Sequence, residues 1–151
     1  MSTVGFPDRL DRAAQEQPPF QLAISLHTAD DALHARLVPA MADVPVADIL
    51  AAGDRWFEVT GREVTYEIVL LENITDSTAQ ADLLARSLAG RRCSVNLIPF
   101  NDVGESGYRF PDPRRVTAFA QRLMDVGLTA TVRRPRGQDV GAACGQLRLN
   151  R

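Results

Sequence analysis

The chain has 151 residues, of which 45% are hydrophobic and 24% charged, and its formal net charge is −2. These values are ordinary for one globular domain and exclude a disordered chain. No apolar run reaches the roughly 18 residues of a membrane span, and no signal-peptide pattern opens the sequence, so we expect a cytoplasmic protein outside the membrane.

The first third of the chain alternates apolar runs with capped helical segments. Residues 3–5 are expected to end a strand, and residues 22–26 (LAISL) to form a buried one. Asp30 and Asp31 are suitable caps for a short helix that ends near Pro39.

A second helix is expected from about residue 46 to residue 59, with Gly61 as its C-terminal cap. Its apolar face consists of Ile49, Leu50, Trp56 and Phe57. Residues 64–71 (VTYEIVLL) predict a strand that is buried on both faces.

The remaining elements follow the same alternation. Residues 77–80 (STAQ) form a capping-box signature for a helix that ends at Gly90, and residues 93–100 predict a strand. After a loop, Asp112 and Pro113 begin a helix that ends at Gly127, and residues 129–134 predict the last strand. This order predicts an α/β fold of four to five parallel strands joined by right-handed crossovers.

Small polar residues follow several predicted strands, where parallel sheets carry their functional groups. They are Ser2, Ser25, His27 and Asn101. Such groups are suited to bind a ribose, an amino acid or a nucleobase. A serine at a strand end also commonly caps a turn, and a histidine there is often structural, so both interpretations stay open.

The two cysteines, Cys93 and Cys144, lie 51 residues apart and match no disulfide framework or metal-ligand spacing. Cys93 falls within an apolar strand and is expected to be a small core residue. Cys144 follows a basic segment, in which Arg133, Arg134 and Arg136 would favour its nucleophilic thiolate. Cys144 is therefore either a functional thiol or an ordinary free cysteine.

Charge is distributed unevenly along the chain. Residues 1–90 contain 6 Arg and 14 acidic residues, whereas residues 91–151 contain 11 Arg and 5 acidic residues. This excess favours an anionic partner on the C-terminal part, or it is simply a solvated surface.

Five segments together resemble the RlmN/Cfr family of radical-SAM methyltransferases, in order and over nearly the whole chain. They are LAISLH (22–27), VTYEIVLL (64–71), VNLIPFN (95–101), TVRRPRG (131–137) and AACGQL (142–147). The resemblance implies the C-terminal part of a partial parallel (β/α) barrel of radical-SAM type. It is closer to the RlmN branch, which methylates carbon 2 of an adenine in 23S rRNA and tRNA. The Cfr branch, which modifies carbon 8, stays open.

The resemblance also implies roles for individual residues. Cys144 matches the cysteine that accepts a methyl group from S-adenosyl-L-methionine and carries it as S-methylcysteine before transfer to adenine. The residues that match contacts to S-adenosyl-L-methionine are Ser2, Ser25, Leu26, His27 and Asn101.

The chain lacks the CxxxCxxC motif that holds the family's [4Fe-4S] cluster, together with an upstream cysteine and a glutamate base. Gln138 also replaces a common acidic residue. We therefore expect residues 1–151 to be the C-terminal portion of a radical-SAM core domain, without the N-terminal cluster-binding and RNA-binding parts and inactive alone. Its expected partners are that N-terminal half and the RNA. A non-catalytic remnant that binds RNA or a protein, or a truncated product without function, are the alternatives.

A barrel cut in this way should expose the edge of strand 22–26 and an apolar inner face. On that basis we expect the isolated chain to self-associate or to be weakly stable.

Overall fold

The computed structural model describes residues 1–100 and 109–133 of the chain. Its strands are β1 (Ser2–Thr3), β2 (Leu22–Ser25), β3 (Val64–Leu70), β4 (Cys93–Pro99) and β5 (Thr129–Val132). Its helices are α1 (Pro7–Gln15), α2 (Asp31–Leu37), the 3-10 helix η1 (Pro39–Met41), α3 (Val46–Thr60), α4 (Thr78–Leu88) and α5 (Pro113–Asp125).

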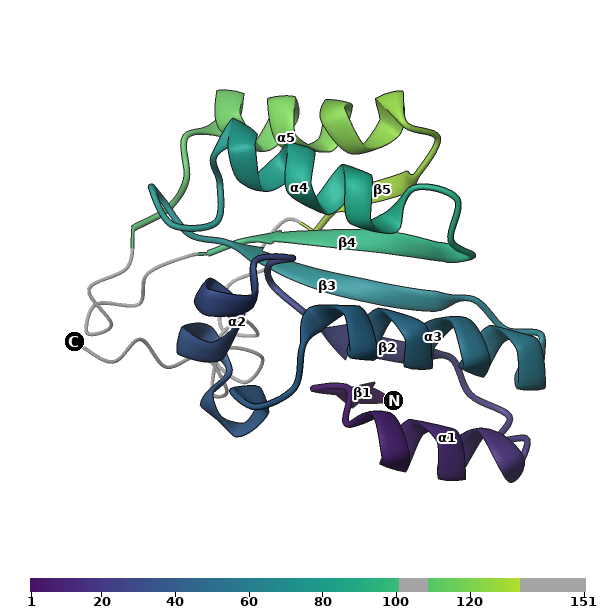
Figure 1. The fold of residues 1–151 in the computed structure, drawn as a ribbon. Coiled ribbons are helices and arrows are strands. Elements are labelled where there is room, and N and C mark those ends of the chain that lie inside the picture. The colour runs from purple at the N-terminus through teal and green to yellow at the C-terminus, as the bar shows by residue number, and fades with distance from the viewer. Residues whose placement is uncertain (101–108, 134–151) are drawn as a thin grey trace.

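The five strands form one parallel sheet in which the spatial order equals the chain order, β1-β2-β3-β4-β5. When successive crossovers have the same hand and the strands never reverse order, all helices cover the same face and the sheet curves toward a barrel. Helices α3, α4 and α5 lie along this outer side, while α2 lies at the carboxyl ends of the strands (Figure 1). The predicted α/β class and partial parallel barrel are confirmed.

The hydrophobic core lies between the sheet and these helices. Ile24, Tyr66, Ile68 and Leu97 point outward from three neighbouring strands and are at most 1% exposed. Helix α3 packs so closely here that a Cβ on Gly53 would collide with the Tyr66 hydroxyl. This face therefore supplies most of the apolar burial that stabilises the fold.

The helix ends follow the chemistry expected of them. Asp30 caps α2 by accepting the Leu33 N–H at 2.8 Å, and Asp112 caps α5 by accepting the Arg114 N–H at 2.8 Å. Gly61 ends α3 in the left-handed conformation, with φ +70°. No helix within residues 1–100 and 109–133 is long and apolar enough to cross a membrane.

Helix α1 is the main element that the sequence interpretation missed, since the stretch after residue 5 carried no predicted element. Its signals are Pro7 at the first helical position, Asp8 in the first turn, and the buried pair Leu10 and Ala14 at helical spacing. The helix is short and mostly polar, so those two residues alone mark its buried face.

The expectation for residues 64–71 was partly wrong. The side chains of Thr65 and Glu67 are only half-buried, whereas the last residues of the strand, from Ile68 onward, are fully buried. The expected apolar inner face is present only in part, because polar side chains occupy it at Thr65 and Glu67, while Val69 and Ile98 nearer the carboxyl edge are apolar and buried. The edge of strand 22–26 was expected to be exposed, but β1 covers part of it by pairing with β2 at Ala23 and Ile24.

Candidate functional site

Strand β3 continues past the end of β2, and this mismatch shapes the carboxyl edge of the sheet. In a parallel strand, the N–H and C=O of alternate residues point to the same neighbour. The N–H and C=O of Val69 and the N–H of Leu71 face the side of β3 on which β2 lies. Strand β2 has already ended there, at Ser25. Buried backbone groups require partners, so side chains must replace the missing strand.

His27 and Thr75 supply these partners. The Nδ1 atom of His27 accepts the Val69 N–H at 3.1 Å. The Thr75 hydroxyl accepts the Leu71 N–H at 2.8 Å and donates to the Val69 carbonyl at 2.7 Å. His27 therefore has a structural role at the end of β3, as one of the two interpretations anticipated.

The chain turns sharply at His27. Its φ is +67°, and the Thr28 N–H donates to the Leu26 carbonyl at 2.8 Å, which closes a tight γ-turn. The carbonyl of Glu67 accepts both the Leu26 N–H at 3.0 Å and the His27 N–H at 3.1 Å. A strained, over-determined backbone of this kind is typical of ligand-binding segments.

The imidazole of His27 is neutral in the folded protein. Burial, and secondarily the nearby His34, lower its pKa from 6.5 to about 3. Because Nδ1 accepts a hydrogen bond, the proton must lie on Nε2. This Nε2–H makes no hydrogen bond within the described residues and is available to donate to a ligand.

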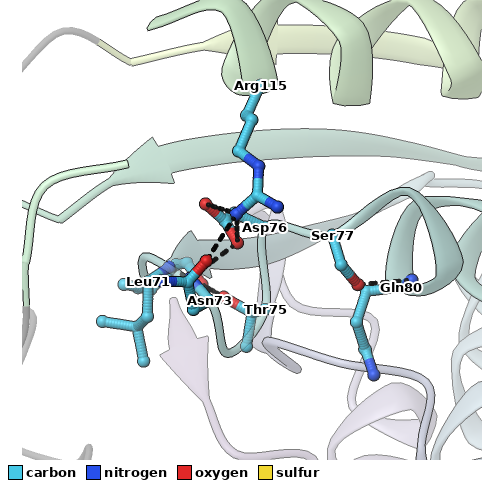
Figure 2. Close-up of polar contacts among 8 residues, drawn as sticks. Leu71, Asn73, Thr75, Asp76, Ser77, Gln80 and Arg115 are labelled. Carbon is cyan, nitrogen blue, oxygen red and sulfur yellow. Dashed lines mark hydrogen bonds and ion pairs between the residues drawn. The ribbon is translucent and has the colours of Figure 1, made fainter. Parts of the chain in front are cut away.

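The loop that follows β3 is fixed by a polar network (Figure 2). The fully buried carboxylate of Asp76 accepts the Asn73 N–H at 2.8 Å and the Arg115 guanidinium at 3.1 and 3.2 Å. Arg115 also donates to the Asn73 side chain at 2.9 Å. Helix α5 is thereby tied to the loop that contains Thr75.

Helix α4 is tied to the turn after β2 by one further bond. Ser77 caps α4 by accepting the Gln80 N–H at 3.1 Å, as the capping-box signature predicts (Figure 2). The Gln80 side chain does not complete the box, however, because its Oε1 accepts the Thr28 hydroxyl at 2.5 Å. The segment around His27 is thus held from α4 as well as from β3.

The inner face of the sheet carries cross-strand polar pairs. The Ser25 hydroxyl donates to the Glu67 carboxylate at 3.3 Å, and the hydroxyls of Thr65 and Ser94 lie 3.0 Å apart. The Thr131 hydroxyl donates to Asn96 Oδ1 at 3.4 Å. The register places Ser25, Glu67, Asn96 and Thr131 side by side across four strands. A polar row replaces the apolar layer that fills a closed barrel.

The candidate site residues that the sequence indicated differ in their position at this edge and in the exposure of their side chains. Ser25 lies on the inner side, and His27, two residues later, lies beyond the end of β2 and against the backbone of Val69. The Leu26 side chain is 0% exposed and packs in the core, so only its backbone is available to a ligand. Ser2 lies on β1 level with Ala23, and its side chain is exposed. Asn101 and Cys144 lie outside the described residues.

Two residues of this edge were not singled out from the sequence. Glu67 is an acidic residue within the apolar run VTYEIVL, and that contrast is a signal that could have found it. Thr75 offers no such signal, because its role depends on β3 extending beyond the end of β2.

The described residues do not fit an iron–sulfur cluster. Within residues 1–100 and 109–133, no three His, Cys, Asp or Glu side chains are grouped to hold a metal ion. Cys93 is half-buried, and burial raises the pKa of its thiol to about 11, which disfavours the thiolate that a cluster needs.

No family model matches the chain. It is, however, 46% identical over 147 residues to a "Probable dual-specificity RNA methyltransferase RlmN" of Frankia casuarinae, covering 97% of this chain and 35% of the relative. A protein of the same name from Symbiobacterium thermophilum is 45% identical, with coverage of 98% and 40%. The chain is homologous to one part of the RlmN-type methyltransferases. This confirms the resemblance that the sequence segments indicated.

Solved structures agree with that relationship. The chain superposes on a "radical SAM methyltransferase from Sphaerobacter thermophilus" with a TM-score of 0.89 and 44% identity, covering 97% of this chain and 43% of that one. A domain of pyruvate-formate lyase-activating enzyme from Bacteroides vulgatus shares the fold, with a TM-score of 0.68 and 24% identity. The chain thus spans less than half of the length of its RlmN relatives and of the Sphaerobacter structure.

Proposed function

We propose that these 151 residues are the C-terminal portion of the core domain of a radical-SAM RNA methyltransferase. The observation that carries this proposal is the match to the Sphaerobacter radical SAM methyltransferase, with a TM-score of 0.89 and 44% identity over 97% of the chain. The RlmN-named relatives support RNA as the substrate class. We infer an adenine of 23S rRNA and tRNA as the target, modified at carbon 2, in the cytoplasm.

The proposed cosubstrate is S-adenosyl-L-methionine, bound at the carboxyl edge of the sheet. The groups present there fit its chemistry. The Nε2–H of His27 can donate to an adenine nitrogen or a carboxylate, and the Ser25–Glu67 pair can accept from a hydroxyl or an ammonium group. Ser2, Asn101 and the backbone of Leu26 complete the proposed set of contacts.

The [4Fe-4S] cluster would supply radical chemistry in the complete protein, but its ligands are not among these residues. The chain contains two cysteines, and a cluster of this type takes three or four. We therefore infer that a further N-terminal segment supplies the cluster and part of the RNA-binding surface. The 151 residues alone should not methylate RNA.

Cys144 is the proposed methyl carrier. Its thiolate sulfur would attack the methyl carbon of S-adenosyl-L-methionine, so that the carbon–sulfonium bond breaks and S-adenosylhomocysteine leaves. The S-methyl group would then be the carbon donated to adenine.

The decisive experiment uses the complete protein, in which residues 1–151 act together with the cluster-bearing segment. Cys144→Ala should abolish RNA methylation, because alanine offers no nucleophile. Cys93→Ala should keep most of the turnover and cost only packing, about 1 kcal/mol. The measurement is mass spectrometry of an RNA fragment, with the folding of each variant checked. Full activity in Cys144→Ala, or equal loss in a well-folded Cys93→Ala, would overturn the assignment.

A second candidate is a non-catalytic module that binds RNA or a protein. The observation in its favour is the Arg excess of residues 91–151. It predicts salt-sensitive RNA binding by the isolated chain without any affinity for S-adenosyl-L-methionine.

A further inference from the structure

Glu67 differs from three other acidic residues that are partly or fully buried. Asp54, Asp76 and Asp82 each form an ion pair with an arginine. Glu67 lies half-buried on the inner face, and within the described residues it has no cationic partner. A carboxylate in such a place is costly unless something compensates its charge.

The position of Glu67 links it to the turn at His27. It lies level with Ser25 in the register of β2 and β3. Its backbone carbonyl accepts two N–H groups of the turn, and its Oε2 accepts the Ser25 hydroxyl at 3.3 Å. One residue therefore positions the turn through its backbone and the serine through its side chain.

The direction of the serine bond determines what the pair can recognise. A carboxylate can only accept, so the hydroxyl proton of Ser25 is directed toward Glu67. The lone pairs of the Ser25 oxygen and of the carboxylate are left to face a ligand. The pair is then an acceptor for ligand O–H or N–H groups, and its negative charge opposes phosphate.

We propose that Glu67 is a specificity-determining residue of the cosubstrate site. With Ser25 it selects a ligand that presents hydrogen-bond donors, and it discriminates against nucleotides that carry phosphate. This rests on the proposed function, in which this edge binds S-adenosyl-L-methionine. The donors available from that molecule are its ribose hydroxyls and its ammonium group.

A purely structural role is the competing explanation. The neutral pair Thr65–Ser94 lies on the same face one row away, and it joins β3 to β4 without any charge. If Glu67 served only to join β2 and β3, its substitution would change the melting temperature and leave ligand selectivity unaltered. Selectivity is therefore the informative measurement.

The test is calorimetric titration of the 151-residue chain with S-adenosylhomocysteine, 5′-methylthioadenosine and adenosine 5′-monophosphate. Glu67→Gln keeps the size of the side chain but removes its charge and adds a donor. It should weaken binding of S-adenosylhomocysteine about tenfold, as expected for loss of a charge-assisted hydrogen bond. The preference over adenosine 5′-monophosphate should shrink as well. Ser25→Ala should weaken the same ligand less.

Glu63→Gln is the matched control, because Glu63 directly precedes β3 but pairs with Arg92 at 3.6 Å on the surface. It should bind all three probes as the wild type does. Weakening for both S-adenosylhomocysteine and 5′-methylthioadenosine identifies the ribose as the donor, and weakening for the first alone identifies the ammonium group.

Unchanged affinity and selectivity in folded Glu67→Gln would overturn the role of Glu67 and leave the proposed function standing. If Glu67→Gln does not fold, unchanged binding by Ser25→Ala would overturn the role instead. Failure of the wild-type chain to bind S-adenosylhomocysteine would contradict the proposal that this edge is a cosubstrate site, and the role of Glu67 with it.

Discussion

The two faces of the sheet are built for different purposes from the same strands. On β3, Tyr66 and Ile68 point outward into the helices and are at most 1% exposed. Thr65 and Glu67 alternate with them, point inward, and form polar bonds to neighbouring strands. The outer face therefore stabilises the fold. At Thr65 and Glu67 the inner face instead holds polar groups in position and buries less apolar surface. At the level of Thr65 and Glu67 the half-barrel can present a polar binding surface, whereas Val69 and Ile98, farther along the same face, are buried.

Substitutions of two neighbouring residues of β3 should show the largest difference in stability between the outer and the inner face. Ile68→Ala removes a side chain that is 0% exposed, and we expect a loss of about 2–5 kcal/mol in the free energy of unfolding. Glu67→Gln, one residue earlier, should change it by less than about 1 kcal/mol, since water can replace the lost bond. Urea unfolding of both variants measures the difference. Equal losses would contradict the division between the faces.

At the carboxyl edge, a polar side chain contributes to the stability of the fold, because Thr75 bonds to the buried backbone of β3. Thr75→Val keeps the shape of the side chain but leaves the Leu71 N–H and the Val69 carbonyl without their partner. We expect a loss of about 1–3 kcal/mol, because both groups are buried.

Thr65→Val is the control for that substitution, since its half-buried hydroxyl bonds only to Ser94. Its cost should stay below about 1 kcal/mol in the same urea unfolding measurement. A larger cost for Thr65→Val than for Thr75→Val would show that the edge does not depend on Thr75.

Acidification should weaken the edge through His27. Burial lowers its pKa from 6.5 to about 3, so the unfolded chain binds a proton that the folded protein does not. The folded state is therefore unaffected above pH 6.5 and loses stability as the pH falls toward 3, on the order of 1 kcal/mol between pH 6.5 and 5.

His27→Asn should reduce this pH dependence, because asparagine tolerates a positive φ and does not titrate. The check is urea unfolding of both proteins at pH 7 and pH 5. A slope that stays the same in His27→Asn would mean that another group, such as the buried His34, causes it.

Local chemistry made much of the fold predictable from the sequence. Caps such as Asp30 and Asp112 act on neighbouring residues, and Gly61 needs only its own conformation, so these elements appear where the pattern places them. Helix α1 was missed because its buried face consists of two residues, Leu10 and Ala14. The inner polar row was missed because the run at 64–71 has a strongly apolar average, and the alternation of Thr65 and Glu67 within it was overlooked.

The candidate site was predictable to a smaller extent. Position after a strand was enough to single out Ser25 and His27. The acceptance of the Val69 N–H by His27 requires knowledge of where β2 ends relative to β3, which is a property of the register between distant segments. The bond from Thr28 to Gln80 likewise crosses 52 residues and replaces the local bond that the capping signature predicts.

The most direct test of the proposed cosubstrate site is to map the binding of S-adenosylhomocysteine on the 151-residue chain by amide chemical shifts. We expect changes at the turn formed by Ser25, Leu26 and His27 and at Glu67, with little change along the outward side of α4 and α5. Changes confined to those helices, or no saturable change at the turn, would contradict the claim that the inner side of this sheet carries the cosubstrate site.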